Sequence, residues 1–140
     1  MDKKKQLGLL EVVPLFHGLS AKEMARVARV AEEVSLPAGS VIAEEGQPGD
    51  AIYLLADGAA LVRRNGKKIA SLGTGDFFGE MSLLDEGPRS ATVELVRDST
   101  LLVLHRQDFA AVLSDFPGVA RIMLQGLAAR LREADRKMVV

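Results

Sequence analysis

Glycine recurs every several residues through the middle of the chain, where it separates short apolar runs such as AIYLLA, AALV and TLLVLH. The glycines of this stretch are Gly39, Gly46, Gly49, Gly58, Gly66, Gly73, Gly75, Gly79 and Gly87. Short apolar runs bounded by turn residues are typical of a sandwich, barrel or jelly roll rather than of alternating strands and helices. Asn65-Gly66 in LVRRNGKKIASL predicts a two-residue hairpin, because this pair tolerates positive φ at both positions. We therefore expect an antiparallel β-roll (jelly-roll) over residues 32–105.

Helical patterns flank this β region on both sides. Ser20 and Glu23 form a capping-box pattern, and apolar residues then recur at helical spacing to about Val30. After His105, RQDFAAVLSDF predicts a short helix, and Pro117 is well placed to open a second one. The apolar stripe of that second helix consists of Val119, Met123, Leu127, Leu131 and Ala134. The chain is thus expected to be one mainly β domain with flanking helices: an N-terminal helical segment (1–31), a β-roll (32–105) and two C-terminal helices (106–139).

Composition argues against several classes of function. The 140 residues carry a net charge of −1, which gives no signal for nucleic-acid binding, and they include no cysteine for disulfides or thiolate chemistry. No apolar run approaches the roughly 20 residues of a membrane helix, and Glu11 and Pro14 interrupt the apolar stretch near the start, so we expect a cytoplasmic protein. His17 and His105 are too few and too far apart for a cupin-type metal centre. A small-molecule ligand is favoured over a nucleic-acid partner, and metal catalysis is not expected.

The segment GEMSLLDEGPRSATV places a carboxylate at Glu80 and a guanidinium at Arg89. GEMSLL is predicted to form one helical turn whose N–H groups, from Met81 to Leu83, point outward toward an anion. Gly79 leaves room for a ligand near the backbone, and Arg89 presents a planar fork that fits two phosphate oxygens. Since Glu80 repels phosphate, it is better explained as an acceptor for a ribose hydroxyl beside that phosphate. The alternative is a surface ion pair between Glu80 and Arg89.

The longer segment FGEMSLLDEGPRSATV resembles the phosphate-binding cassette of the cyclic nucleotide-binding domain family. The segment LPAGSVIAEEGQPGDAIYLLADGAALV is similar to the first strands and glycine turns of that family, and FHGLS before the first helix adds to the likeness. The resemblance implies that Glu80 accepts from the ribose 2′-hydroxyl and that Arg89 pairs with the cyclic phosphate. The other pocket residues that it implies are Gly79, Met81, Ser82, Ser90 and Ala91, with Val62 and Leu72 beside the base.

The same resemblance implies a switch rather than a catalyst, without a cofactor and with cAMP or cGMP as the ligand. In this family the helix after the roll moves over the ligand as a lid, and here the lid candidate runs from Pro117 to Val139. The lid residues expected near the ligand are Leu131, Arg132, Ala134, Asp135 and Arg136. Ser90 does not distinguish the two nucleotides, and we expect cAMP rather than cGMP.

Family members usually carry a further output unit, such as a DNA-binding motif, a kinase, an exchange factor or a channel, whereas only DRKMVV follows Ala134 here. We therefore expect the output in an effector protein or fused effector domain outside this sequence. A homodimer through the C-terminal helix is a further expectation, and neither nucleic acid nor membrane is expected as a partner. The alternative function is a protein-interaction scaffold that binds no nucleotide. Retention of both Glu80 and Arg89 favours nucleotide binding, because a degenerate pocket has no need of that pair.

Overall fold

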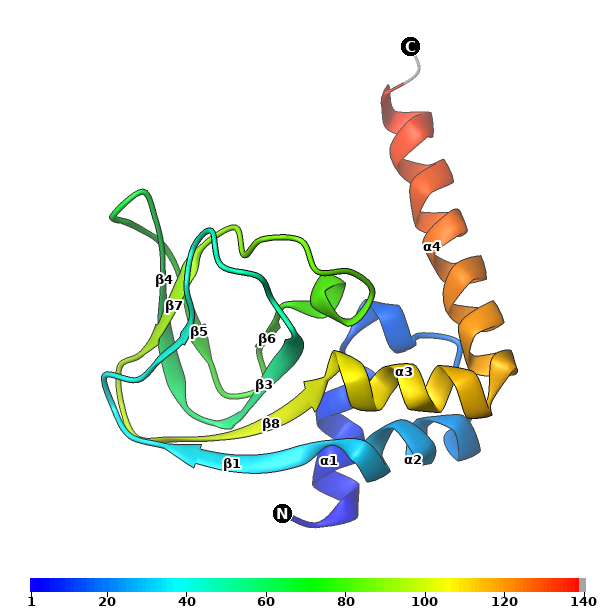
Figure 1. Ribbon diagram of the computed structural model, residues 1–140, viewed down its shortest axis with the longest axis horizontal. Helices are drawn as coiled ribbons and strands as arrows, with labels where there is room; N and C mark the ends of the chain where they lie inside the picture. Colours follow the sequence, from blue (N-terminus) through cyan, green and yellow to red (C-terminus); the bar gives the residue numbers. More distant parts are fainter. Residues whose placement is uncertain (139–140) are drawn as a thin grey trace.

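The computed structural model describes residues 1–138, and within them eight strands form two four-stranded antiparallel sheets (Figure 1). One sheet has the strand order β1-β8-β3-β6 and the other β2-β7-β4-β5. The strands are β1 (Glu32–Leu36), β2 (Val41–Ala43), β3 (Ala51–Asp57), β4 (Ala59–Arg64), β5 (Lys67–Gly73), β6 (Phe77–Phe78), β7 (Thr92–Leu95) and β8 (Ser99–His105). The predicted β-roll is confirmed.

Strands β3 and β8 form the centre of the molecule, because both of their faces are buried. Alternate side chains of a strand point to opposite faces. On one face, Ile52 and Leu54 of β3 and Leu102 and Leu104 of β8 pack against the helices. On the other face, a second cluster lies between the two sheets, formed by Ala43, Ala51, Leu55, Ala60, Val93, Leu95, Leu101 and Val103. Fully buried strands of this kind read as continuous apolar runs, which is why AIYLLA and TLLVLH stand out in the sequence.

The hairpin between β4 and β5 turns at Asn65-Gly66, as predicted. Asn65 has φ of 53° and Gly66 has φ of 77°, and Arg64 pairs with Lys67 directly across the turn. Positive φ at both central residues is the geometry that Asn-Gly favours in a two-residue hairpin.

Three helical elements precede the roll: α1 (Lys3–Glu11), the 3₁₀ turn η1 (Pro14–Phe16) and α2 (Ala21–Val30). The capping box of α2 is confirmed, since the Ser20 hydroxyl accepts from the Glu23 amide at 3.2 Å and the Glu23 carboxylate accepts from the Ser20 amide at 2.8 Å. Phe16 of η1 is buried and lies against Phe109, with ring centroids 5.8 Å apart. This contact joins the N-terminal helices to those after the roll.

The two helices after the roll are α3 (Arg106–Asp115) and α4 (Pro117–Met138). Pro117 opens α4 as predicted, but only the first part of its apolar stripe is buried. Val119 and Met123 are buried, whereas Leu131 is 64% exposed. Figure 1 shows the reason: α4 leaves the body after its first turns, and its C-terminal half projects away from the sheets.

Candidate functional site

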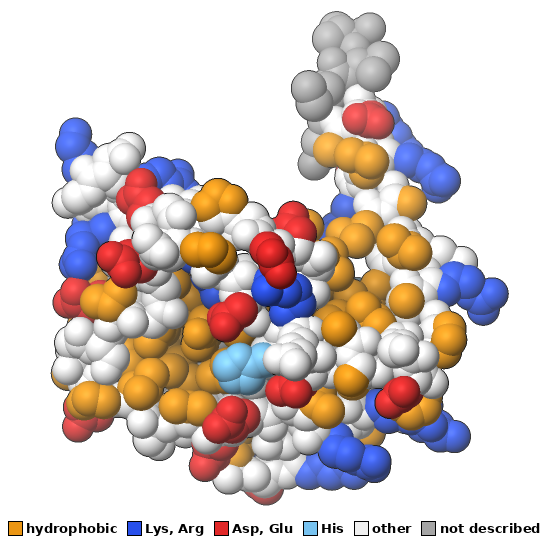
Figure 2. Space-filling model, viewed as in Figure 1, with side chains coloured by type: hydrophobic (Ala, Val, Ile, Leu, Met, Phe, Trp, Pro, Cys, Tyr) orange, Lys and Arg blue, Asp and Glu red, His pale blue; other side chains and the backbone are white. Residues whose placement is uncertain are grey.

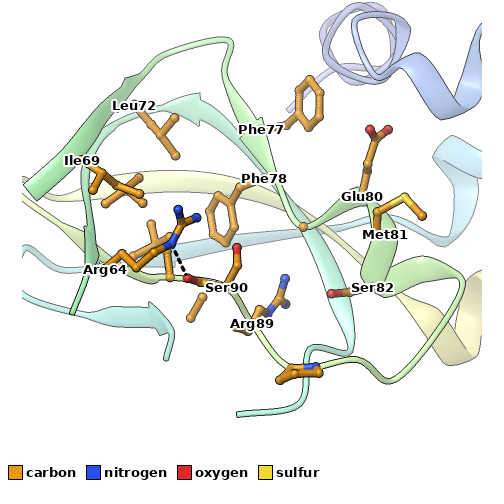
Figure 3. Close-up of a pocket in the computed structure, with 16 residues that line it drawn as sticks. Arg64, Ile69, Leu72, Phe77, Phe78, Glu80, Met81, Ser82, Arg89 and Ser90 are labelled. Atoms are coloured by element: carbon orange, nitrogen blue, oxygen red, sulfur yellow. Dashed lines mark hydrogen bonds between the residues drawn. The ribbon is translucent and has the colours of Figure 1, made fainter. Parts of the chain in front are cut away.

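The site is a cavity of about 440 Å³ between the sheet of β4, β5 and β7 and the segment from Gly79 to Val93, which is called the cassette below (Figure 3). All nine residues that the sequence placed around a ligand line this cavity: Val62, Leu72, Gly79, Glu80, Met81, Ser82, Arg89, Ser90 and Ala91. Seven further residues complete the lining: Ala43, Arg64, Ile69, Phe77, Phe78, Pro88 and Val93. Most of these seven are apolar strand residues, whose pattern in the sequence signals burial but not a shared cavity.

Arg89 is held at one end of this cavity by backbone groups. Its amide donates to the Gln47 carbonyl at 2.8 Å, its own carbonyl accepts from the Gly46 amide at 2.9 Å, and its guanidinium Nη2 donates to the Ala51 carbonyl at 2.9 Å. Partial burial lowers the pKa of the Arg89 guanidinium, although nearby Tyr53 and Asp50 act in the opposite direction. Among the described residues no carboxylate forms an ion pair with it. A half-buried cation of this kind is suited to an anionic ligand.

Two glycines bring the backbone up against the Arg89 guanidinium. Gly79 has φ of +88°, and a Cβ there would meet Arg89 Nη1 and lie 2.9 Å from the Ala51 carbonyl oxygen. A Cβ on Gly49 would meet the Ser82 hydroxyl and lie 2.6 Å from Arg89 Nε. Gly79 therefore has a role in seating Arg89, beyond the ligand access predicted for it. Nothing in the sequence singled out Gly49 from the other turn glycines.

Glu80 opens the 3₁₀ turn η2 (Glu80–Leu83) and is engaged by two distant elements. Its Oε2 accepts from the Leu15 amide of η1 at 3.2 Å, and its Oε1 lies 3.6 Å from Arg130 Nη1 of α4. The alternative of an ion pair between Glu80 and Arg89 is therefore wrong for this structure. Neither partner of Glu80 was predicted, because each is distant in the sequence.

The backbone of η2 differs in part from the prediction. The Ser82 amide donates to the Gly79 carbonyl at 2.9 Å, so it is not one of the outward-pointing N–H groups expected from Met81 to Leu83. The reason is that a 3₁₀ turn closes each bond after three residues and leaves fewer orphan donors than an α-turn. Ser82 itself is buried, whereas the Met81 side chain is 52% exposed.

The opposite wall of the cavity is apolar apart from one arginine. Leu72 and Ile69 of β5 point into it, and Phe78 lies between them and Arg89 in Figure 3. Arg64 at the end of β4 donates from Nε to the Ser90 carbonyl at 2.9 Å, which fixes its guanidinium beside the cassette. An apolar wall facing a cationic end suits a ligand with a flat, weakly polar part and an anionic part.

The predicted lid residues lie away from this cavity. The exposed positions are Leu131, Arg132, Ala134, Asp135 and Arg136, and none of them lines it. The α4 residue that approaches the site is instead Arg130, through Glu80. Val139, the predicted end of the lid, lies outside the described residues.

Comparison with known proteins identifies the family. The family model described as "Cyclic nucleotide-binding domain" matches residues 33–116. The chain belongs to this family. It is 42% identical to the cyclic AMP receptor protein of Thermus thermophilus over 89% of this chain, but it spans only 60% of that protein. The N-terminal domain of a transcriptional regulator from Streptomyces coelicolor is 33% identical, with a TM-score of 0.84, and the match covers 94% of this chain and 95% of that one.

A third similar structure is the regulatory domain of Toxoplasma gondii PKA in a co-crystal with cAMP. It is 31% identical, has a TM-score of 0.70, and matches over 82% of this chain and 47% of that one. Within residues 1–138 of this chain, no cluster of three or more His, Asp or Glu side chains is arranged to hold a metal ion. None of the described helices has the length and apolar character needed to cross a membrane.

Proposed function

We propose that the cavity beside the cassette binds a cyclic mononucleotide, with Arg89 pairing with the cyclic phosphate. The observation that carries this proposal is the environment of Arg89. Its guanidinium is half-buried, donates to a backbone carbonyl and has no carboxylate partner among the described residues. A desolvated cation is stabilised by an anion that supplies a bidentate partner, and a phosphate does so.

The rest of the cavity supports a sugar and a base beside that phosphate. Glu80 accepts from the ribose 2′-hydroxyl, while Val62 and Leu72 flank the base. Gly79, Met81, Ser82, Ser90 and Ala91 line the same cavity, and we assign them as the remaining ligand contacts. We propose cAMP rather than cGMP, because the Thermus relative is named for cyclic AMP and the Toxoplasma regulatory domain was co-crystallised with cAMP.

Ligand binding rearranges the helices through Glu80. The carboxylate assigned to the ribose is already engaged by Leu15 of η1 and by Arg130 of α4. A 2′-hydroxyl that donates to Glu80 competes with these two donors, so the positions of η1 and α4 become coupled to the occupancy of the cavity. The lid therefore acts through Arg130 near the middle of α4, and residues 131–136 reach the ligand only if α4 moves.

The chain acts as a sensor rather than a catalyst, and its output lies in an effector protein or a fused domain. α4 also carries an uncovered apolar surface, because Leu124 is 66% exposed and Leu131 is 64% exposed. These residues are seven positions apart and share one face of the helix, the spacing of a two-helix seam. We propose a homodimer through this face, with neither nucleic acid nor membrane as a direct partner.

Calorimetry of the purified chain with cAMP, cGMP and 2′-deoxy-cAMP tests the proposal. We expect cAMP to bind more tightly than 2′-deoxy-cAMP, because the deoxy compound leaves Glu80 without its hydroxyl partner. We also expect cAMP to bind more tightly than cGMP, as proposed above from the relatives. Arg89→Leu removes charge-assisted hydrogen bonds of about 3 kcal/mol in total, so cAMP affinity should fall at least about a hundredfold.

The control for that variant is Arg63→Leu, since Arg63 pairs with Glu94 on the same sheet and does not line the cavity. Far-ultraviolet circular dichroism verifies that both variants keep the fold. Cyclic nucleotide binding is excluded if the native chain binds none of the three compounds, and a scaffold function then replaces it. Unchanged cAMP affinity in folded Arg89→Leu would remove Arg89 from the phosphate site.

A further inference from the structure

Arg106 is the first residue of α3, and its side chain reaches back to the cassette without lining the cavity. One guanidinium nitrogen, Nη1, lies within hydrogen-bonding distance of three backbone carbonyls: Gly49 at 2.7 Å, Asp85 at 2.9 Å and Ser82 at 3.2 Å. The backbone amide of Arg106 also donates to the Asp50 carbonyl at 2.7 Å. A single residue at the start of a helix thus contacts four backbone carbonyls in two segments next to the candidate ligand site.

The three carbonyls belong to the two segments that seat Arg89. Ser82 and Asp85 lie in and just after η2, on the cassette. Gly49 lies in the loop of residues 44–50, called the support loop, whose Gln47 carbonyl accepts from the Arg89 amide at 2.8 Å. Gly49 also packs directly against the Arg89 guanidinium. Arg106 therefore joins the support loop to the cassette at the place where both contact Arg89.

The carbonyls are the principal partners of Arg106. Its only ion pair among the described residues is with Glu86, whose Oε1 lies 3.5 Å from Nη2 and whose side chain is 82% exposed. An exposed ion pair of this kind contributes little, because water screens it. The Arg106 side chain is only 25% exposed, and its bonds to the Gly49 and Ser82 carbonyls are partly buried. Hydrogen bonds from a charged donor are among the stronger ones.

We infer that Arg106 is a positioning residue for the ligand. It holds the cassette and the support loop at the spacing that Arg89 needs, and it links both of them to the first turn of α3. A ligand that shifts the cassette shifts α3 through this side chain, by a route separate from the contact between Glu80 and Arg130. This inference rests on the proposed function for its ligand, but the link between α3 and the cassette does not depend on the ligand.

Arg106→Met is the direct test, because it keeps the apolar stem and removes every donor. We expect its cAMP affinity, measured by calorimetry, to fall at least about tenfold, since Arg89 loses its fixed support. The matched control is Arg97→Met, which removes an arginine paired with Asp57 at 2.9 Å, away from the cavity. The control should change the affinity by less than about twofold.

Hydrogen exchange gives a readout that does not need nucleotide. The amides of Leu84 and Asp85 donate to the Met81 carbonyl at 3.0 Å and 3.2 Å, so they report on the order of the cassette. In the nucleotide-free protein, Arg106→Met should raise their exchange at least about tenfold, whereas Arg97→Met should not. With saturating cAMP, the first turn of α3 should change protection in the native chain but not in Arg106→Met.

Several outcomes separate this inference from the proposed function. If the native chain binds cAMP and Arg106→Met binds it equally well, Arg106 is not a positioning residue, although the proposed function stands. If the native chain binds no nucleotide, the proposed function fails. Independently of nucleotide, unchanged hydrogen exchange at Leu84 and Asp85 in Arg106→Met would overturn the link between α3 and the cassette. Arg106→Gln, which keeps a polar but uncharged side chain, takes the place of Arg106→Met if thermal melting shows that the methionine variant does not fold.

Discussion

Gly79 combines two requirements at the scale of the single residue, a left-handed backbone and direct contact with Arg89. We predict that Gly79→Ala lowers stability by about 1–2 kcal/mol, because a Cβ at φ of +88° is strained. The same Cβ would displace the Arg89 guanidinium, so cAMP affinity should fall at least about tenfold. Chemical denaturation measures the first effect and calorimetry measures the second.

Gly126→Ala is the matched control for Gly79→Ala. Gly126 lies within α4, and a Cβ there would meet nothing within 4 Å. Alanine is the better helix former by about 1 kcal/mol, so this variant should be equally stable or more stable and should bind cAMP normally. Native affinity in Gly79→Ala would show that Arg89 does not depend on the close approach of the backbone.

Glu80 and Arg89 were recognisable in the sequence because they lie within one short segment whose glycines and charges follow a known pattern. The residues that hold these two side chains in place were not recognisable in the sequence. Arg106 reaches Gly49 across 57 positions of the chain, and Glu80 is contacted from η1 across 65 positions. Such contacts depend on the tertiary fold, and an arginine that begins a helix looks in the sequence like any charged surface residue.

Local signals identified the elements whose bonding is local. The capping box of α2 and the Asn65-Gly66 hairpin are each confirmed by bonds or pairing within three residues. The apolar stripe of α4 is different, because periodicity shows which face is apolar but not what covers it. The sequence therefore predicted the helix and its apolar stripe, but not that burial is confined to the first turns, where Val119 and Met123 lie.

The contact between α4 and Glu80 leads to a prediction at the scale of elements. We predict that Arg130→Gln binds cAMP up to about fivefold more tightly, because Arg130 competes with the ribose for the Glu80 carboxylate. The effect is small, since Arg130 is 44% exposed and a partly exposed ion pair contributes about 1 kcal/mol or less. Titration calorimetry of native and variant chains measures it.

Arg121→Gln is the control for Arg130→Gln, because it removes the same charge from an exposed position of α4 that lies outside the lid residues and the cavity lining. It should leave the affinity unchanged. If Arg130→Gln binds cAMP more weakly than the native chain, Arg130 stabilises the bound state, and competition for Glu80 is the wrong account of the coupling.

The whole molecule consists of a compact body and a helix that leaves it. The body buries its apolar side chains in two clusters on either side of β3 and β8. The projecting part of α4 has no such cover, and Figure 2 shows apolar side chains along it. An exposed apolar face of this kind marks a site of association.

We predict that the chain dimerises through this face of α4 and that the double variant Leu124→Glu/Leu131→Glu is monomeric. Both leucines are about two-thirds exposed in the single chain, at 66% and 64%. Burying each of them against a second copy contributes about 1.5–3 kcal/mol, which a glutamate at the same position replaces with a desolvation cost.

Sedimentation velocity measures the mass of both proteins with and without cAMP. The control is Gln125→Glu/Ala129→Glu, which adds the same two charges at exposed positions about 100–140° around the helix from the leucine face, and it should leave the dimer intact. If Glu80 and Arg130 couple dimerisation to the ligand, the dissociation constant of the dimer must change when cAMP binds. A native chain that stays monomeric at all concentrations would instead leave this face of α4 to an effector, and equal dissociation of both double variants would show that the added charge, not the leucine face, controls the association.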